Sequence, residues 1–185
     1  KKTDERMEEN VHYISMAIPN EEVRVIFKNT VLSWFEQKIS KKDLTPLYKS
    51  ILEGRCEDFE TAVSQMLREG ISFYDTKESF YHGFLMGLLN GLEDYYAFSN
   101  RESGLGRYDI CLKSMEADKP AVLMELKVAA GYGELEERSS QALQQILEKE
   151  YERELVWEGY REVLCYGIAF YKKSCRIKLE KHKLS

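Results

Sequence analysis

The sequence lacks any apolar stretch that approaches the roughly 20 residues a membrane-spanning helix needs. Its first residues also lack the basic and then apolar layout of a secretory signal peptide. Hydrophobic residues make up 43% of the 185 residues and charged residues 32%, which is enough for one packed core beneath a charged surface. The composition predicts a soluble globular protein with no membrane partner, and the cytoplasm is its expected location.

Cysteine is scarce and widely spaced. The four cysteines include no C-x-x-C pair and have no neighbouring histidine at metal-binding spacing; they are Cys56, Cys111, Cys165 and Cys175. This pattern favours neither a zinc site nor a disulfide framework. We expect reduced thiols, most of them buried.

An excess of basic residues is also absent. The net charge of −5 and the pI near 5.4 argue against a protein that grips nucleic acid with its whole surface. Positive charge gathers in residues 172–185, which hold six Lys or Arg residues and one Glu. Two interpretations fit this stretch, namely a surface that faces phosphates and a solvated terminal strand and tail.

Helical periodicity dominates the first part of the chain. Residues 18–39 have Asn20 as a helix N-cap, glutamates in the first turn and apolar residues every three or four positions. Two shorter helices are expected at about 44–52 and 56–68. Residues 1–70 therefore predict a helical N-terminal extension. Because the chain begins with Lys and not Met, we expect it to be part of a longer protein.

Two further helices are expected in the second part, residues 71–185. The first, at about 77–92, contains a glycine at every fourth position, Gly83, Gly87 and Gly91. Because a glycine inside a helix costs about 1 kcal/mol, the repeat predicts close packing against another element. The second helix is long, from about Leu135 to Glu154, with an apolar stripe along one side.

Strand signals surround this second helix. Runs rich in β-branched and aromatic residues predict strands at about 94–102, 106–114, 120–128 and 163–173, with a possible edge strand at 175–181. The turn "MEADKP" predicts a hairpin that pairs the second and third strands. The expected class is α/β (α+β), in the order helix, three-stranded meander, helix, strand.

The run "AVLMELKVAA" is expected to form the most deeply buried strand, yet it contains Glu125 and Lys127. Alternation places Leu123, Glu125 and Lys127 on one face of the strand. A buried charge is strongly disfavoured unless it is paired, hydrogen-bonded or bound to a metal. The hairpin lays Asp109 on the adjacent strand. Two carboxylates on neighbouring strands with a cation beside them predict a pocket for a hard metal ion such as Mg²⁺.

These residues resemble a known family. "GRYDICLKS", a hairpin and "AVLMELKVA" are similar to the D…(D/E)-x-K signature of the PD-(D/E)XK nuclease superfamily, with Asp109, Glu125 and Lys127 in its three positions. Flanking segments resemble the branch found C-terminal to an AAA-ATPase-like domain in bacterial and archaeal proteins, namely "IPNEEVR", "ESFYHGFLMGLL", "SNRESGLGRYD" and "QQILEKEY". The sequence has "RYD" where restriction enzymes often carry a proline, as is usual in this branch. The resemblance covers about residues 13–171 and implies a restriction-endonuclease-like core for residues 71–185.

The resemblance implies roles for the central residues. Asp109 and Glu125 would hold Mg²⁺ or Mn²⁺, with the backbone carbonyl of Leu126 as a third ligand. Lys127 would orient or deprotonate the attacking water and favour the charge that develops on phosphorus. A buried ion-pair cluster is the structural alternative, and so is a degenerate relative that has kept the site but lost activity.

Four residues near the signature allow two interpretations each. Glu78 and His82 share one helix face and either approach the pocket, with Glu78 as an additional carboxylate, or serve as a helix start and a bond to a neighbouring strand. Glu102 either reaches the metal or is an exposed loop acid. Arg107 either contacts the phosphate or neutralises Glu102.

Gln145 and Tyr151 resemble the Gln…Tyr motif that some nucleases of this superfamily carry beside the site. There the two residues bind substrate or support the lysine. Tyr151 also falls on the apolar stripe of its helix, which favours core packing.

Three hypotheses about function stay open at this point. The first is a metal-dependent nuclease that acts on DNA or RNA. The second is a nuclease-like module that does not cut but binds a protein or nucleic-acid partner, or regulates an attached ATPase-like domain; the acidic net charge favours it. The third is an α/β domain whose buried charges stabilise a subunit interface.

Overall fold

The computed structural model describes residues 2–8, 11–16, 42–70, 78–99, 102–103, 106–116 and 118–184. The chain divides into two compact units, Lys1–Lys42 and Asp43–Ser185. In the first unit, β1 (Lys2–Glu8) and β2 (Val11–Met16) form an antiparallel hairpin. The expectation of helices throughout the first 70 residues is therefore wrong here, because "VHYISM" is rich in residues that favour strands. The helix expected at 18–39 lies outside the described residues.

Two helices open the second unit. They are α2 (Thr45–Glu53) and α3 (Cys56–Gly70), close to the positions that the periodicity predicts. Gly54 ends α2 in the left-handed conformation, with φ of 80°, and its N–H donates to the carbonyl of Ile51. Both helices lie in the same compact unit as the sheet, so the sequence-based division at residue 70 does not coincide with the division into compact units.

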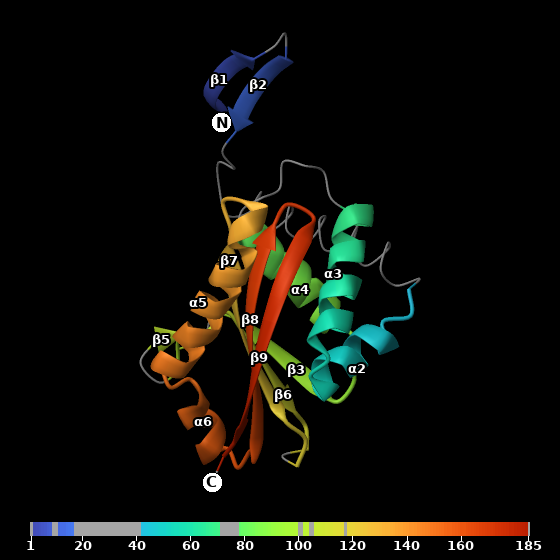
Figure 1. Ribbon diagram of the computed structural model, residues 1–185, viewed down its shortest axis with the longest axis vertical. Coiled ribbons are helices and arrows are strands. Elements are labelled where there is room, and N and C mark those ends of the chain that lie inside the picture. The colour runs from blue at the N-terminus through green and yellow to red at the C-terminus, as the bar shows by residue number, and fades with distance from the viewer. Residues whose placement is uncertain are drawn as a thin grey trace. The chain divides into compact units, whose positions relative to one another are not determined.

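A five-stranded sheet forms the centre of this unit (Figure 1). Its strands, in spatial order, are β3 (Tyr95–Ser99), β6 (Ile110–Ser114), β7 (Ala121–Val128), β8 (Glu162–Tyr171) and β9 (Ser174–Lys183). The first three form the expected antiparallel meander, β8 lies parallel to β7, and β9 is the expected edge strand. The α/β (α+β) class is confirmed.

The crossover from β7 to β8 contains a short 3₁₀ turn, Tyr132–Glu134, and two helices, α5 (Leu135–Glu148) and α6 (Glu152–Trp157). The single helix expected from Leu135 to Glu154 is therefore wrong at its end. Glu150 has a φ of 53°, which interrupts the helix. The turn lets the hydroxyl of Tyr151 donate to the backbone carbonyl of Arg107, at 2.8 Å.

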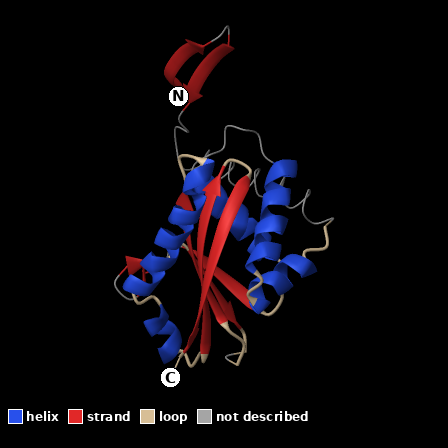
Figure 2. Ribbon diagram, in the orientation of Figure 1, coloured by secondary structure: helices blue, strands red, loops and turns tan. Residues whose placement is uncertain are grey.

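Helices cover both faces of the sheet (Figures 1 and 2). On one face, α3 and α4 (Glu78–Leu89) contribute aromatic contacts: the rings of Tyr81 and Phe170 stack at 4.4 Å, and Phe59 meets Tyr166 edge-on at 5.6 Å. On the other face, side chains of α5 and α6 form a core cluster with residues of β6, β7 and β8. No helix in the described part of the chain is long and apolar enough to cross a membrane.

One glycine sets the distance between α5 and the sheet. A Cβ atom on Gly167 in β8 would lie less than 3.0 Å from the carbonyl oxygen of Ser139 and from the backbone nitrogen of Leu143. The helix backbone therefore rests directly on the strand at this point. The close packing predicted for the glycine repeat is wrong at Gly83, where a Cβ atom would meet nothing within 4 Å. It is confirmed at Gly91, where a Cβ atom would lie 2.7 Å from the hydroxyl oxygen of Tyr48 in α2.

Candidate active site

The hairpin of β6 and β7 brings Asp109 and Glu125 together. Asp109 precedes β6, and the pairing of Ile110 with Met124 places the two acids opposite each other at the next step of the ladder. Oδ2 of Asp109 accepts a hydrogen bond from the backbone N–H of Leu126, at 2.8 Å. The carboxylate of Asp109 is thus held against β7, beside Glu125.

Glu125, Lys127 and Gln145 contact one another through their polar side-chain atoms. Oε1 of Glu125 accepts hydrogen bonds from Nε2 of Gln145 and from Nζ of Lys127, the latter at 3.4 Å. Nζ of Lys127 also donates to Oε1 of Gln145, at 2.6 Å. The side chain of Glu125 is 4% exposed and that of Lys127 is 29% exposed, so the ammonium group reaches solvent from a buried carboxylate.

Burial and a neighbouring carboxylate disfavour the charged form of Glu125, and Lys127 offsets this only in part. Burial, and next the charge of Asp109, raise the pKa of Glu125 to about 7, against the opposing effect of Lys127. Its Oε2 atom is buried and accepts no hydrogen bond from any residue in the described part of the chain. A buried carboxylate oxygen without a donor, next to a second carboxylate, suits a hard cation such as Mg²⁺ or Mn²⁺.

Glu78 is the first residue of α4 and is exposed. Its charge makes a small further contribution that raises the pKa of Glu125, so it acts on the same pocket from a greater distance. Among the described residues, Glu78, Asp109 and Glu125 do not place three ligand atoms within 4.8 Å of one another. The candidate site thus has two close carboxylates, Asp109 and Glu125, and a third, Glu78, that is more remote.

His82 supports the backbone of Asp109. Its Nε2 lies 3.1 Å from the carbonyl oxygen of Asp109 and 3.0 Å from Oγ of Ser99. Because a carbonyl only accepts, Nε2 carries the proton and donates it. This is the bond to a neighbouring strand that was the alternative interpretation of His82, and it fixes the residue before β6.

The loop before Asp109 is anchored by Tyr151. The tyrosine is 1% exposed, and the carboxylates of Glu125 and Asp109 add to the effect of burial in raising its pKa. Its partner Arg107 lies in β5 (Gly106–Arg107), which pairs with β4 (Glu102–Ser103), and the guanidinium side chain is exposed. Glu102 stands opposite Arg107 in this ladder, but its side chain lies outside the described part. Tyr151 therefore borders the pocket and also packs in the core.

Sequence reasoning missed Gly167. In the parallel ladder Gly167 is the direct neighbour of Glu125, and the close approach of α5 at this glycine is what brings Gln145 within reach of Glu125 and Lys127. A glycine inside an otherwise apolar strand is a signal of close backbone approach, so the pattern was available in the sequence.

The meander, the crossover helix and the paired acids define a restriction-endonuclease-like core. A model of the PD-(D/E)XK nuclease superfamily matches residues 76–180, which is more than half of the chain and includes Asp109, Glu125 and Lys127. The chain belongs to the PD-(D/E)XK nuclease superfamily. Nucleases of this superfamily generally use divalent metals such as Mg²⁺. No curated protein matches the chain.

Proposed function

We propose that this protein is a metal-dependent nuclease that hydrolyses phosphodiester bonds of DNA or RNA. The observation that carries the proposal is the buried Oε2 atom of Glu125, which has no donor among the described residues and lies beside the carboxylate of Asp109. Such an arrangement is costly in the absence of a cation. The chain's membership of the PD-(D/E)XK nuclease superfamily supports a phosphodiester as the substrate.

Asp109 and Glu125 would hold the ion, with the carbonyl of Leu126 as a third oxygen. The N–H of Leu126 points to Asp109, and within a strand the N–H and C=O groups of one residue point to the same side, so this carbonyl also points to the β6 side. When bound, Mg²⁺ or Mn²⁺ supplies Lewis-acid activation of the phosphate and of a water molecule.

Lys127 is the residue that we assign to the attacking water. Gln145 and Glu125 fix its Nζ atom from the buried side, and the ammonium group remains open to solvent. From this position Nζ orients a water molecule and stabilises negative charge that develops on the phosphoryl oxygens. Arg107, exposed on β5, is placed to contact a neighbouring phosphate.

The Asp109→Asn variant tests the assignment. Asparagine can still accept the hydrogen bond from Leu126, so the loop should hold while the negative charge is lost. We expect cleavage in Mg²⁺ or Mn²⁺ to fall by at least about 100-fold, which is typical when a group that stabilises charge in the transition state is removed. The assay uses labelled single- and double-stranded DNA and RNA, each with Mg²⁺, Mn²⁺ or EDTA. Asp118→Asn, an exposed acid in the β6–β7 turn, is the control.

Wild-type activity in Asp109→Asn would contradict the assignment of Asp109 as a metal ligand. Absence of metal-dependent cleavage on all four substrates would overturn the nuclease proposal itself. That second outcome would leave the non-cutting module as the better hypothesis.

Gln145 should act as a positioning residue for Lys127 and Glu125. In Gln145→Ala the hydrogen bond that stabilises the carboxylate of Glu125 is lost, so the acidic limb of the pH–rate profile should move to higher pH. We expect the maximal rate to fall about 10- to 100-fold, as for other residues that orient a ligand of a metal. Gln144→Ala is the matched control, since Gln144 is exposed and bonds to Glu148. An unchanged profile in Gln145→Ala would contradict the role.

The second candidate function is that of a nuclease-like module that does not cut. It is supported by the ion pair of Lys127 and Glu125, because Lys127 neutralises part of the buried negative charge without a metal ion. In this case the domain would bind a nucleic-acid or protein partner, or regulate an attached ATPase-like domain, without cutting. Titration with Mn²⁺, followed by electron paramagnetic resonance, separates the two: uptake that Asp109→Asn abolishes favours the nuclease, and absence of uptake favours the non-cutting module.

We also propose an AAA-ATPase-like domain of the same protein as a partner. The likeness of the flanking segments to the ATPase-associated branch supports this. In that arrangement residues 1–70 would hold the end of the ATPase-like part and the linker, with α2 and α3 packed in one compact unit with the sheet of the nuclease domain, residues 71–185. The protein would act in the cytoplasm. Co-purification of this chain with the ATPase-like part of its full-length protein after proteolysis of the linker would test the association.

A further inference from the structure

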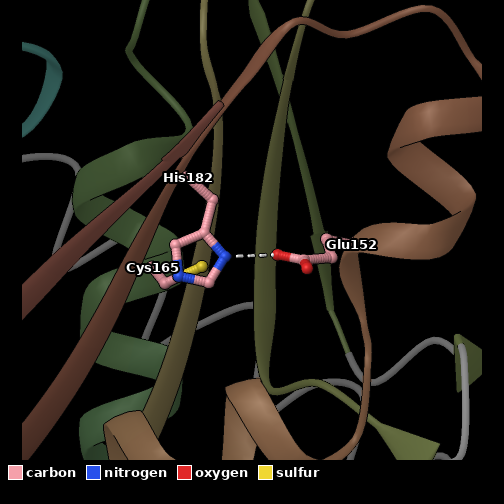
Figure 3. Close-up of side chains that lie close together, drawn as sticks. All are labelled: Glu152, Cys165 and His182. Carbon is pink, nitrogen blue, oxygen red and sulfur yellow. Dashed lines mark hydrogen bonds and ion pairs between the residues drawn. The ribbon is translucent and has the colours of Figure 1, made fainter. Parts of the chain in front are cut away.

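A second group of metal-ligating side chains lies on β8, β9 and α6 and shares no residue with the Asp109–Glu125 site. Glu152, Cys165 and His182 each place one ligand atom within 4.8 Å of the other two. Figure 3 shows the three side chains converging, with the carboxylate of Glu152 facing Nδ1 of His182 at 2.7 Å. The other ring nitrogen, Nε2, bonds to Oε1 of Glu180, at 2.8 Å.

Strand register and helix packing create this group. In the β8–β9 hairpin, Val163 pairs with His182 and Cys165 pairs with Glu180. Directly paired residues and residues two apart share a face of the sheet, so Cys165, Glu180 and His182 all face α5 and α6. Leu155 of α6 packs in the same core cluster as Cys165 of β8. This packing holds α6, whose first residue is Glu152, against the same face of β8 as Cys165.

We propose that Glu152, Cys165 and His182 form a binding site for Zn²⁺. Sulfur, imidazole nitrogen and carboxylate oxygen are the donors that zinc takes in proteins. Zinc-bound histidines almost always donate their second ring N–H to a carboxylate, carbonyl or water, and Glu180 already holds Nε2 in this way. The site leaves a fourth position for water or a further oxygen.

The contact between His182 and Glu152 would have to open slightly to accept the ion. Two ligand bonds of about 2.0 Å at a tetrahedral angle separate nitrogen and oxygen by about 3.3 Å. The Nδ1–Oε2 distance of 2.7 Å would therefore have to open by roughly 0.6 Å. The side chains of His182 and Glu152 are 24% and 34% exposed, so an ion can enter from solvent, while Cys165 supplies its sulfur from the buried side.

The competing explanation is an ion-pair network in which a protonated His182 lies between Glu152 and Glu180. That network needs no sulfur atom. Ligation by the thiolate of Cys165 therefore distinguishes the two explanations, and it has a direct optical signature with Co²⁺ in place of Zn²⁺.

Cobalt titration of the Glu125→Gln variant tests the proposal. In this variant the Asp109–Glu125 site has lost one of its two carboxylates and should no longer compete for the ion. We expect one equivalent of Co²⁺ to give a thiolate-to-cobalt charge-transfer band in the near ultraviolet, and Zn²⁺ to displace it. Introducing Cys165→Ser should remove the band and weaken zinc binding by at least about 100-fold, and Glu180→Gln should weaken it by about 10- to 100-fold. Cys175→Ser, a buried thiol that contacts Ser64, should leave both unchanged.

The proposal is overturned if Co²⁺ gives no charge-transfer band with the chain that retains Cys165. It is also overturned if the band persists in Cys165→Ser. The first result does not depend on the folding of any cysteine variant, and the nuclease assay is not involved in either result.

Discussion

In EDTA at pH 8, the Glu125→Gln variant should be more stable than the wild-type protein by about 3 kcal/mol, although it should not cleave nucleic acid. The pKa of Glu125 rises from 4.5 to about 7 on folding, so the folded state binds this proton more tightly than the unfolded state. The contribution of the protonated acid to stability is complete below pH 4.5 and is lost as the pH rises through 7. The gap between the two pKa values corresponds to about 3 kcal/mol.

Urea unfolding at pH 5 and at pH 8 measures this effect. The advantage of Glu125→Gln over wild type should be small at pH 5 and should reach its full size at pH 8. Addition of Mg²⁺ should then stabilise the wild type more than the variant, because only the wild type keeps both carboxylates. Glu93→Gln, at an exposed position, is the control and should show no such trend. Parallel pH dependences for wild type and Glu125→Gln would show that the pKa of Glu125 is not raised on folding.

Gly167→Ala should destabilise the protein by about 3 kcal/mol or more, at the upper end of the usual cost of overpacking. The added methyl group would collide with two backbone atoms of α5, at Ser139 and Leu143, and a backbone cannot rotate away as a side chain can. The helix would have to move off the sheet, and Gln145 would move with it. We therefore expect the folded fraction of Gly167→Ala to lose activity as well.

Gly83→Ala is the matched substitution with the opposite expected sign. A Cβ atom at Gly83 meets open space inside α4, so alanine should stabilise the helix by about 0.5 to 1 kcal/mol. Thermal unfolding followed by circular dichroism measures both variants. A Gly167→Ala protein with wild-type stability would mean that α5 does not rest on β8 as described.

The order of helices and strands could be predicted because periodicity and turn residues are local properties. The "MEADKP" turn was enough to pair β6 with β7, and that pairing alone brought Asp109 towards Glu125. The break at Glu150 could not be predicted in this way. It accompanies the bond from Tyr151 to the carbonyl of Arg107, which joins residues far apart in the chain.

The residues that sequence reasoning missed are those that depend on register between distant segments. Cys165 and His182 have no spacing typical of a zinc site, and only the pairing of β8 with β9 brings them to one face. The glycines show the same limit: in the repeat, Gly91 lies against a side chain and Gly83 does not, whereas the close approach of two backbones occurs at the isolated Gly167. A glycine inside an apolar strand indicates a close backbone approach, but only the fold shows that α5 is the element that approaches.

The bond from Leu126 to Asp109 has a consequence for how the chain folds. Backbone pairing between β6 and β7 ends at Ile110 and Met124, and beyond that point a side chain takes over as the acceptor. If β6 slipped along β7 by one residue, that acceptor would be lost and Asp109 would no longer stand opposite Glu125. A misaligned hairpin would thus lose a hydrogen bond and the pairing of the acids together, so the observed register is favoured over a slipped one.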